Sequence, residues 1–480
     1  MLIFAVIIYL LLTIGIGLYA ARQVSSAKDF MVAGRSLPLH ISIATVFATW
    51  FGAETVLSVS ATFAKDGLVG IPADPFGASF CLLIVALFFA RAFYRMDLLT
   101  IGDFYRKRYG KSVEVFTSLA ITISYLGWTS AQMTALGLVI TVLSQGALSL
   151  NQSILIGAFI VLFYTIWGGM WSVALTDLFQ TVVILIGLLL VAWLIGDMAG
   201  GAAKVIATAS ETGKLTLLPT GGLSQWLGFL AAFLTMALGS IPQQDVFQRV
   251  TSAKDEKTAV RGTLIGGALY FCFAFVPMFI AMAALIIEPK LAELFKAEDA
   301  REIQRILPDL ILARMPMWAQ IMFFGALLSA ILSTASGALL APSSLFTENV
   351  LRPFMGPVSD RRFLLILRCV LALFTMSALL FALNSKSTMY EMVQNAYKVT
   401  LTGALIPLVF GLFWRRSTTQ GALLSVFMGL ATWIICEQNF ADALVPPQLN
   451  GLGAALIAML VGSLAPQIFN EPARASQRTT

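Results

Sequence analysis

Few charged residues, one histidine and four cysteines mark this sequence, and each shortage excludes a class of protein. Charged residues make up 12% of the 480 positions, about half the share found in an average soluble domain. A single histidine argues against a histidine-rich catalytic or metal cluster, so we expect neither an enzyme nor a bound organic cofactor. The cysteines show neither metal-ligand nor disulfide spacing, and we read them all as small buried hydrophobes: Cys81, Cys272, Cys369 and Cys436.

Apolar residues dominate instead, and 58% of the sequence is hydrophobic. One soluble core cannot bury so much apolar surface, whereas lipid can replace water around it. The runs are close to the ~20 residues that a membrane-spanning helix needs, and the alternation of lipid-facing barrel strands is absent. The first run begins at Leu2 without a basic segment or a clear cleavage site, so we expect a retained helix. The sequence therefore predicts an all-α polytopic membrane protein.

We predict thirteen spans from these runs. Their expected positions are near residues 2–21, 39–64, 70–94, 113–144, 152–168, 173–198, 223–246, 263–287, 317–347, 363–384, 390–414, 419–437 and 450–470. The longest polar stretch, 288–316, mixes both charge signs and predicts a partly helical loop outside the membrane.

Basic residues alternate between rich and poor connections along the chain. Twenty Lys and Arg residues fall in one alternating set of connections, and nine fall in the other. Because cytoplasmic loops carry the excess of Lys and Arg, the N-terminus should face outward and the C-terminus the cytoplasm. The net charge of +6 then reflects topology and not a nucleic-acid surface. We expect a protein of the plasma membrane, which in a bacterium is the inner membrane.

Two predicted spans contain residues that interrupt a helix. The span 39–64 holds Gly52 and Glu54, and the span 223–246 holds Pro242, which removes a backbone hydrogen-bond donor. Irregular backbone at membrane depth survives only where protein buries it or where it lines a wet cavity. A single such residue is often only a kink, but a matched pair in two halves of a chain is typical of a transporter binding site.

The two interrupted spans lie five helices apart, which predicts an internal repeat. An odd number of spans per unit inverts the second copy, so we expect two five-helix repeats of opposite orientation. The chain then divides into a first helix and loop at 1–38, a repeat at 39–198, a loop at 199–222, a repeat at 223–414, and two peripheral helices with a tail at 415–480.

The ninth span carries small and hydroxyl-bearing residues that could bind a cation. Ser333 and Thr334 offer hydroxyls, Ala330 offers a carbonyl, and the break at 48–51 would free further carbonyls. Sodium needs several oxygen ligands, and such groups supply them together. The same residues would also permit close helix packing, or their hydroxyls could bond back to their own helix.

Asp177 is a carboxylate at the expected start of the sixth span. An ionisable residue inside a membrane is a functional hypothesis by default. The alternative is that Asp177 caps a helix N-terminus, where its charge meets the helix dipole.

Several of these segments together resemble the sodium:solute symporter family. The matching stretches are residues 28–35 after the first span, Gly168-Gly169 leading to Thr176-Asp177 and Gln180, residues 244–249, and the pair Ser333-Thr334. The resemblance covers nearly the whole chain and implies a leucine-transporter-like fold of five plus five helices, which rocks between outward-open and inward-open states.

The resemblance also implies a set of sodium ligands. Ala48 and Phe51 match the carbonyl ligands of the first core helix, and Asp177 matches an acid beside the ion. In the eighth core helix the matching ligands are Ala330, Ser333 and Thr334. Ser336 could extend a second sodium site, but Gly337 stands where a further hydroxyl would be needed, so we expect one sodium.

The solute is less well defined by the sequence. Resemblance to the family's sugar carriers places Trp50, Glu54, Thr55 and Asp74 near the solute. Resemblance to its choline carriers adds Trp128, but there Gln243 replaces a Trp and Ala78 stands near an expected Tyr, so the aromatic cage is incomplete. Either Trp could instead be a packing or interface residue, and Glu54 could instead pair with Lys398.

These patterns predict sodium-coupled import of a small organic solute by alternating access. The expected partners are the solute, sodium and the lipid bilayer, and the protein could be a monomer or a homodimer. A proton-coupled symporter of the same fold and a membrane solute sensor without transport are the alternatives.

Overall fold

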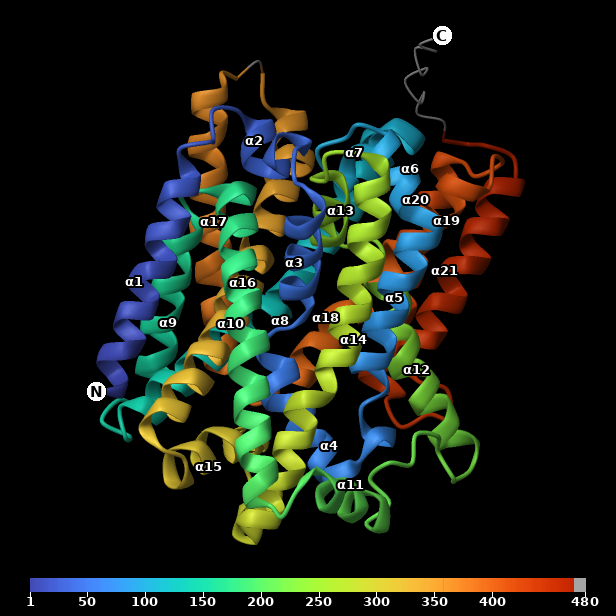
Figure 1. Cartoon of the computed structure of the whole chain (residues 1–480). Coiled ribbons are helices and arrows are strands. Elements are labelled where there is room, and N and C mark those ends of the chain that lie inside the picture. The colour runs from blue at the N-terminus through green and yellow to red at the C-terminus, as the bar shows by residue number, and fades with distance from the viewer. Residues whose placement is uncertain (357, 470–480) are drawn as a thin grey trace.

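A computed structural model describes residues 1–356 and 358–469 as an assembly of helices packed side by side (Figure 1). In this part of the chain no strand forms, and the one isolated bridge joins Leu37 to Ala253. The basic residues of the C-terminal tail and the end of the predicted span 450–470 lie outside the described residues. The predicted all-α class is confirmed.

Nine helices of the described chain are long and apolar enough to cross a membrane. They are α1 (Leu2–Ala21), the segment Pro72–Arg95 that ends in α6 (Ala90–Arg95), α8 (Lys111–Leu143), α10 (Gly169–Met198), α14 (Glu256–Ile287), Met317–Phe354 with α16 (Met317–Leu345) and η8 (Phe346–Leu351), α17 (Asp360–Asn384), α20 (Thr419–Asn439) and α21 (Pro447–Leu464).

Three further helix pairs are bent at a short break, which raises the number of candidate spans to as many as twelve. The first is α3 (Leu39–Trp50) with Glu54–Asp66, bent by 53°, and the second is α12 (Leu223–Gly239) with α13 (Gln244–Thr251), bent by 44°. Both predicted interruptions are therefore present. The third pair, α18 (Met389–Gly403) with α19 (Leu405–Phe413), bends by 45° and was not expected.

The shorter helix α9 (Leu150–Thr165) occupies the predicted span 152–168, with an apolar stretch from Leu150 to Phe163. Nine to twelve spans are supported by length and composition, so the count of thirteen stays a prediction.

Short helices lie at the two ends of the bundle (Figure 1). The end that holds α2 (Ala27–Val32) and α7 (Ile101–Tyr109) is called here the α2 end. The opposite end, called the α15 end, holds α11 (Ala202–Glu211) and α15 (Ile306–Arg314). The predicted loop 288–316 is partly helical, because α15 follows two short 3₁₀ helices in it, Pro289–Lys296 and Ala300–Arg305.

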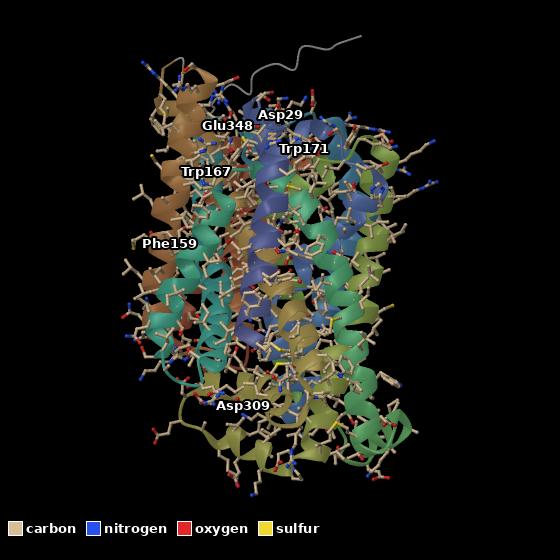
Figure 2. All side chains as sticks on the ribbon, turned by 60° about the vertical axis from the view of Figure 1, so that its left-hand side comes forward. Asp29, Phe159, Trp167, Trp171, Asp309 and Glu348 are labelled. Carbon is tan, nitrogen blue, oxygen red and sulfur yellow. The ribbon has the colours of Figure 1, made fainter. Side chains whose placement is uncertain are left out.

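The outer surface between the ends is apolar. Figure 2 shows Phe159 pointing outward from the middle of the bundle, whereas Asp29 and Asp309 lie toward opposite ends. Phe159 and Trp193 are each 69% exposed, as side chains that face lipid should be. Two of the cysteines are exposed, so the prediction that all four are buried is wrong for Cys272 and Cys369; Cys436 is half-buried, and only Cys81 is fully buried. A small apolar side chain is stable against lipid as well as in a core.

The interior is built where the bent helices meet the long straight ones. α10 packs along α16, α18 along α8, and α3 against both α14 and α10. Thr181 of α10 donates a hydrogen bond to the Ala44 carbonyl of α3 at 3.3 Å. These contacts bring the break after Trp50 beside the hydroxyl-bearing stretch of α16.

Candidate functional site

The break after α3 and the middle of α16 are joined directly by hydrogen bonds. The Ser333 hydroxyl donates to the Ala48 carbonyl at 2.6 Å, and the Thr334 hydroxyl reaches the Ala48 and Thr49 carbonyls at 3.2 and 3.4 Å. Helix α3 ends at Trp50, and Phe51 has φ −87° and ψ 74°, outside the helical range. The two hydroxyls therefore cross to another helix and do not merely bond back to their own.

Three other predicted sodium residues are buried around this contact. Ala330, Phe51 and Ser336 are fully buried. Ala330 lies one helical turn before Thr334, so its carbonyl points along α16 toward Thr334. The Ser336 hydroxyl donates to the Ser333 carbonyl at 2.9 Å, which is the bonding-back arrangement. The structure thus brings Ala48, Ser333 and Thr334 into contact, whereas the Ser336 hydroxyl bonds within its own helix.

Asp177 lies within α10 and not at its start. The helix begins at Gly169, so the capping interpretation is wrong. Asp177 is fully buried, and neither carboxylate oxygen has a hydrogen-bond partner within the described chain. The nearest opposing charge that acts on it comes from Arg249 of α13. A buried carboxylate without hydrogen bonds is expensive, which favours a binding role over a packing role.

Arg249 is a buried basic residue beside the candidate site that the sequence reasoning did not single out. It is 3% exposed, and its Nε donates to the Thr49 hydroxyl at 2.8 Å. Its guanidinium also lies against Gly337 of α16, where a Cβ would come within 2.6 Å of Nη2. The sequence did hold a signal for it, because an arginine at membrane depth directly after a broken span suggests a functional site. Arg249 links α13 to both helices of the predicted sodium site.

Glu54 follows the break in α3 and accepts hydrogen bonds from α8. Trp128 Nε1 donates to one carboxylate oxygen at 3.2 Å, and Gln132 Nε2 donates to the other at 2.6 Å. Residues four apart share one helix face, so both donors point at the same carboxylate. The structure brings Glu54 and Trp128, two separately predicted solute residues, into contact and adds Gln132, which the sequence reasoning missed.

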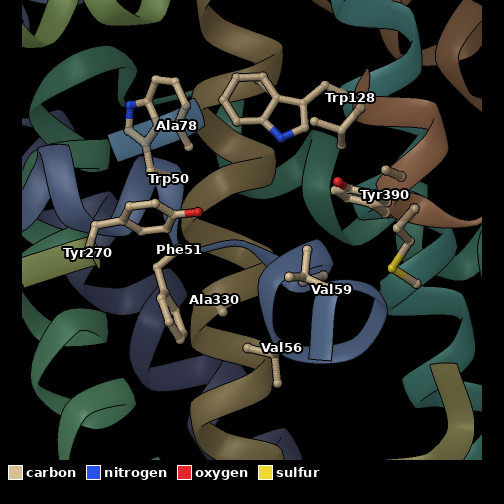
Figure 3. Packing of buried hydrophobic residues seen from close by; sticks show 14 of the residues in the cluster. Trp50, Phe51, Val56, Val59, Ala78, Trp128, Tyr270, Ala330 and Tyr390 are labelled. Atoms are coloured by element: carbon tan, nitrogen blue, oxygen red, sulfur yellow. The ribbon is translucent and has the colours of Figure 1, made fainter. Parts of the chain in front are cut away.

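Asp74 is a second buried carboxylate beside the break. It accepts hydrogen bonds from the Thr55 hydroxyl at 3.2 Å and from the Tyr270 hydroxyl of α14. The Tyr270 ring lies 6.3 Å from the Trp50 ring. Figure 3 shows the hydroxyls of Tyr270 and Tyr390 turned toward the space between their helices. Asp74, Thr55 and Trp50 therefore belong to one connected group, as predicted, and Tyr270 completes it.

Gln243 lies at the second break, as the N-terminal cap of α13. Its Nε2 donates to the Ser124 hydroxyl at 3.0 Å and lies 3.4 Å from the Thr400 hydroxyl. Its carbonyl oxygen Oε1 is buried and has no partner within the described residues. Gln243 is thus near the group around Glu54 but not bonded to it.

Lys398 does not pair with Glu54, so that alternative is wrong. Its Nζ lies 2.9 Å from a carboxylate oxygen of Glu437 on α20. Glu54 remains available to a ligand.

A cavity of ≈ 450 Å³ has Pro72, Phe229 and Tyr390 in its lining. A void of only ≈ 10 Å³ is lined by residues that include Trp50, Asp245 and Arg249.

Known proteins resemble the chain over most of its length. A model of the "Sodium:solute symporter family" matches residues 30–429. The high-affinity choline transporter 1 of Caenorhabditis elegans is 25% identical over 90% of this chain and 77% of its own. The osmoregulated proline transporter OpuE of Bacillus subtilis is 24% identical over 98% of this chain and 95% of its own.

A solved structure, described as the substrate-bound outward-open state of a Na⁺-coupled sialic acid symporter, superposes with a TM-score of 0.81. It covers 97% of this chain and 98% of that chain at 18% identity, so the likeness establishes the fold alone. The relatives carry different solutes, so they do not assign one here.

Proposed function

The chain belongs to the sodium:solute symporter family, and from this premise we propose that it imports a small organic solute together with one sodium ion. The contact of Ser333 and Thr334 with the Ala48 carbonyl carries this proposal. Two hydroxyls and a carbonyl from a broken helix are oxygen ligands of the kind that sodium needs. Phe51 and Ala330 would add carbonyls, and Asp177 would balance the charge of the ion.

The same geometry supports a coupling mechanism. An ion that binds the oxygens of α3 and α16 together would fix the end of α3 and so the position of Trp50, Glu54 and Thr55. Those residues, with Asp74, Trp128 and Gln243, would hold the solute. The ion thus organises the solute pocket, which is how one binding event promotes the other. The two inverted repeats, 39–198 and 223–414, would rock around this centre.

The membrane supplies the driving force for uptake when the N-terminus faces outward. One charge that crosses ~100 mV gains about 2.3 kcal/mol, and a tenfold sodium gradient adds about 1.4 kcal/mol. Together they support an accumulation of a neutral solute of roughly a few hundredfold.

The sodium site can be tested without knowing the solute. We expect sodium chloride to raise the melting temperature of the purified protein above its value in potassium chloride of equal ionic strength, because a ligand of the folded state adds its binding free energy. The double substitution Ser333→Ala with Thr334→Ala should abolish this shift, since it removes two ligands.

Ser336→Ala is the matched control, because its hydroxyl bonds to its own helix and its loss should leave the sodium shift in place. A double variant that keeps the full sodium shift would show that the ion binds elsewhere. Uptake into vesicles under a sodium, potassium or proton gradient then separates sodium coupling from proton coupling. A protein that binds solute but accumulates none would be a sensor.

A further inference from the structure

Two buried carboxylates without a basic partner occupy the centre of the molecule. Glu54 is 4% exposed and Asp74 is 3% exposed, and the charge of Glu54 acts on Asp74. Among the described residues, no lysine or arginine forms an ion pair with either one. Arg249 is the one basic residue that is buried in the described part of the chain, and its charge acts on Asp177 and Asp245. Burying unpaired carboxylates is costly, and a bound cation removes that cost.

Aromatic rings enclose the same carboxylates. Trp128 donates to Glu54, and its ring lies 6.2 Å from the ring of Tyr397 on α18. On the other side, Tyr270 donates to Asp74 and lies beside Trp50. A cation held by the carboxylates would lie close to these rings, and aromatic rings attract cations through their faces.

Gln243 supplies an acceptor at the second helix break. The Gln243 amide nitrogen donates to the Ser124 hydroxyl and lies close to the Thr400 hydroxyl. Ser124 lies about one helical turn from Trp128, and Thr400 lies about one helical turn from Tyr397. One turn of helix is about 5.4 Å. Gln243 is 2% exposed, and its side-chain carbonyl oxygen is buried without a hydrogen-bond partner among the described residues. A buried acceptor without a donor is unfavourable, so a ligand that reaches it should bring a hydrogen.

We propose that the transported solute is a small organic cation that carries N–H groups, such as a primary ammonium or a guanidinium. Glu54 and Asp74 neutralise its charge, and the Gln243 carbonyl accepts one of its hydrogens. A neutral or anionic solute leaves the carboxylates unpaired, and a quaternary ammonium has no N–H to donate. This inference rests on the proposed function, because it names the solute class of the same site.

A graded set of probes tests the charge and the N–H groups separately. The melting temperature of the full-length protein in sodium is measured with 2-aminoethanol, its N-methyl and N,N-dimethyl forms, choline and agmatine. Ethylene glycol is the neutral probe, and glycolate is the anionic one. We expect stabilisation by 2-aminoethanol or agmatine, with the effect of the 2-aminoethanol series falling as methyl groups replace hydrogens.

Equal or greater stabilisation by choline would overturn the N–H requirement. Stabilisation by the neutral or anionic probe alone, or by none of the cations, would overturn the proposal.

Substitution of the carboxylates provides a second test. Asp74→Asn and Glu54→Gln should each weaken binding of the stabilising cation about tenfold to a hundredfold, as loss of a charge-assisted hydrogen bond does. Glu437→Gln is the control, because that carboxylate pairs with Lys398 outside the group. Unchanged affinity in both carboxylate variants would overturn the assignment.

The sodium-dependent shift in melting temperature, measured without any probe, keeps the two proposals apart. A carboxylate variant that retains this shift is folded, so its loss of cation binding reports on the solute site alone. Loss of the sodium shift in Ser333→Ala with Thr334→Ala reports on the ion site alone.

Discussion

At the scale of single residues, the direction of a few hydrogen bonds separates side chains that join two helices from side chains that bond to their own helix. Ser333 and Ser336 are three residues apart on α16, yet one hydroxyl donates to α3 and the other to its own helix. Likewise, Trp128 and Gln132 lie one turn apart and donate to the same Glu54 carboxylate. The site is therefore defined by which helix each side chain faces.

Close packing of α8 and α18 depends on a residue without a side chain. A Cβ on Gly127 would lie 2.6 Å from the Met392 carbonyl of α18, so Gly127→Ala should push apart the helices that carry Trp128 and Tyr397. Overpacking of this kind costs about 1–3 kcal/mol, and we expect a lower melting temperature.

Gly453→Ala on α21 is the matched control, because no atom lies within 4 Å of its Cβ position. Equal melting temperatures of the two variants would contradict the close approach.

The sequence identified the buried carboxylates as candidate site residues, but it could not identify the side chains from distant helices that bond to them. Glu54, Asp74 and Asp177 were conspicuous because carboxylates are rare at membrane depth. Tyr270 and Gln132 were not, because either residue is ordinary in a long helix. Their roles depend on contacts across 196 and 78 positions of sequence, which no local pattern reports.

At the scale of helices, breaks can be predicted where a residue removes backbone hydrogen bonds within a polar stretch. The interruptions at Gly52 and Pro242 were predicted in this way. The bend at Ala404 was missed, although Pro407 lacks the N–H that would bond to the Gly403 carbonyl. The Tyr105 hydroxyl of α7 donates to the Ala404 carbonyl at 2.9 Å, beside the Leu408 N–H that donates to the same carbonyl.

The short 3₁₀ helix Ala300–Arg305 at the α15 end begins at an ion pair between Asp299 and Arg301. Asp299 accepts from Arg301 Nε at 2.9 Å, and Arg301 Nη1 donates to the Ser385 carbonyl at 3.2 Å. The hydrogen bond from Arg301 holds the pKa of Asp299 below its ordinary value of 3.8. A carboxyl group whose pKa is lowered in the folded state stabilises the fold at pH values above its ordinary pKa. This stabilisation is lost as the pH falls through the lowered pKa.

We therefore expect Asp299→Asn to speed amide hydrogen exchange in residues 289–305 at neutral pH. In the unsubstituted protein, cleavage of the same segment by pepsin should increase as the pH is lowered below 3.8. Glu298→Gln, at the exposed neighbouring acid, should change neither measurement. Equal exchange in the Asp299 variant would show that the pair does not hold the segment.

At the scale of the whole molecule, composition was sufficient to predict the fold class but not the number or the orientation of the spans. The apolar runs correctly predicted an all-helical protein with many candidate spans, because lipid imposes length and polarity on each helix. The count of spans is harder, since α9 is short and three spans are bent. The orientation rests on loop charge, and that remains a prediction.

Labelling with a membrane-impermeant maleimide on intact cells tests the orientation. In a chain whose own cysteines are replaced by alanine, Glu211→Cys on α11 should react from outside, because the α15 end faces outward under the predicted topology. Lys107→Cys on α7 should react only after the membrane is opened. The reverse pattern would invert the topology and place the basic loops outside.

The hydrogen bond from Ser333 to the Ala48 carbonyl sets a condition for the proposed sodium site. An ion seated between these two oxygens would displace the hydroxyl hydrogen from the carbonyl. The proposed ion would therefore compete with an internal hydrogen bond for the same oxygens, which would lower its affinity. The ion would then leave readily into a compartment where it is scarce, and the restored hydrogen bond would keep the two helices joined.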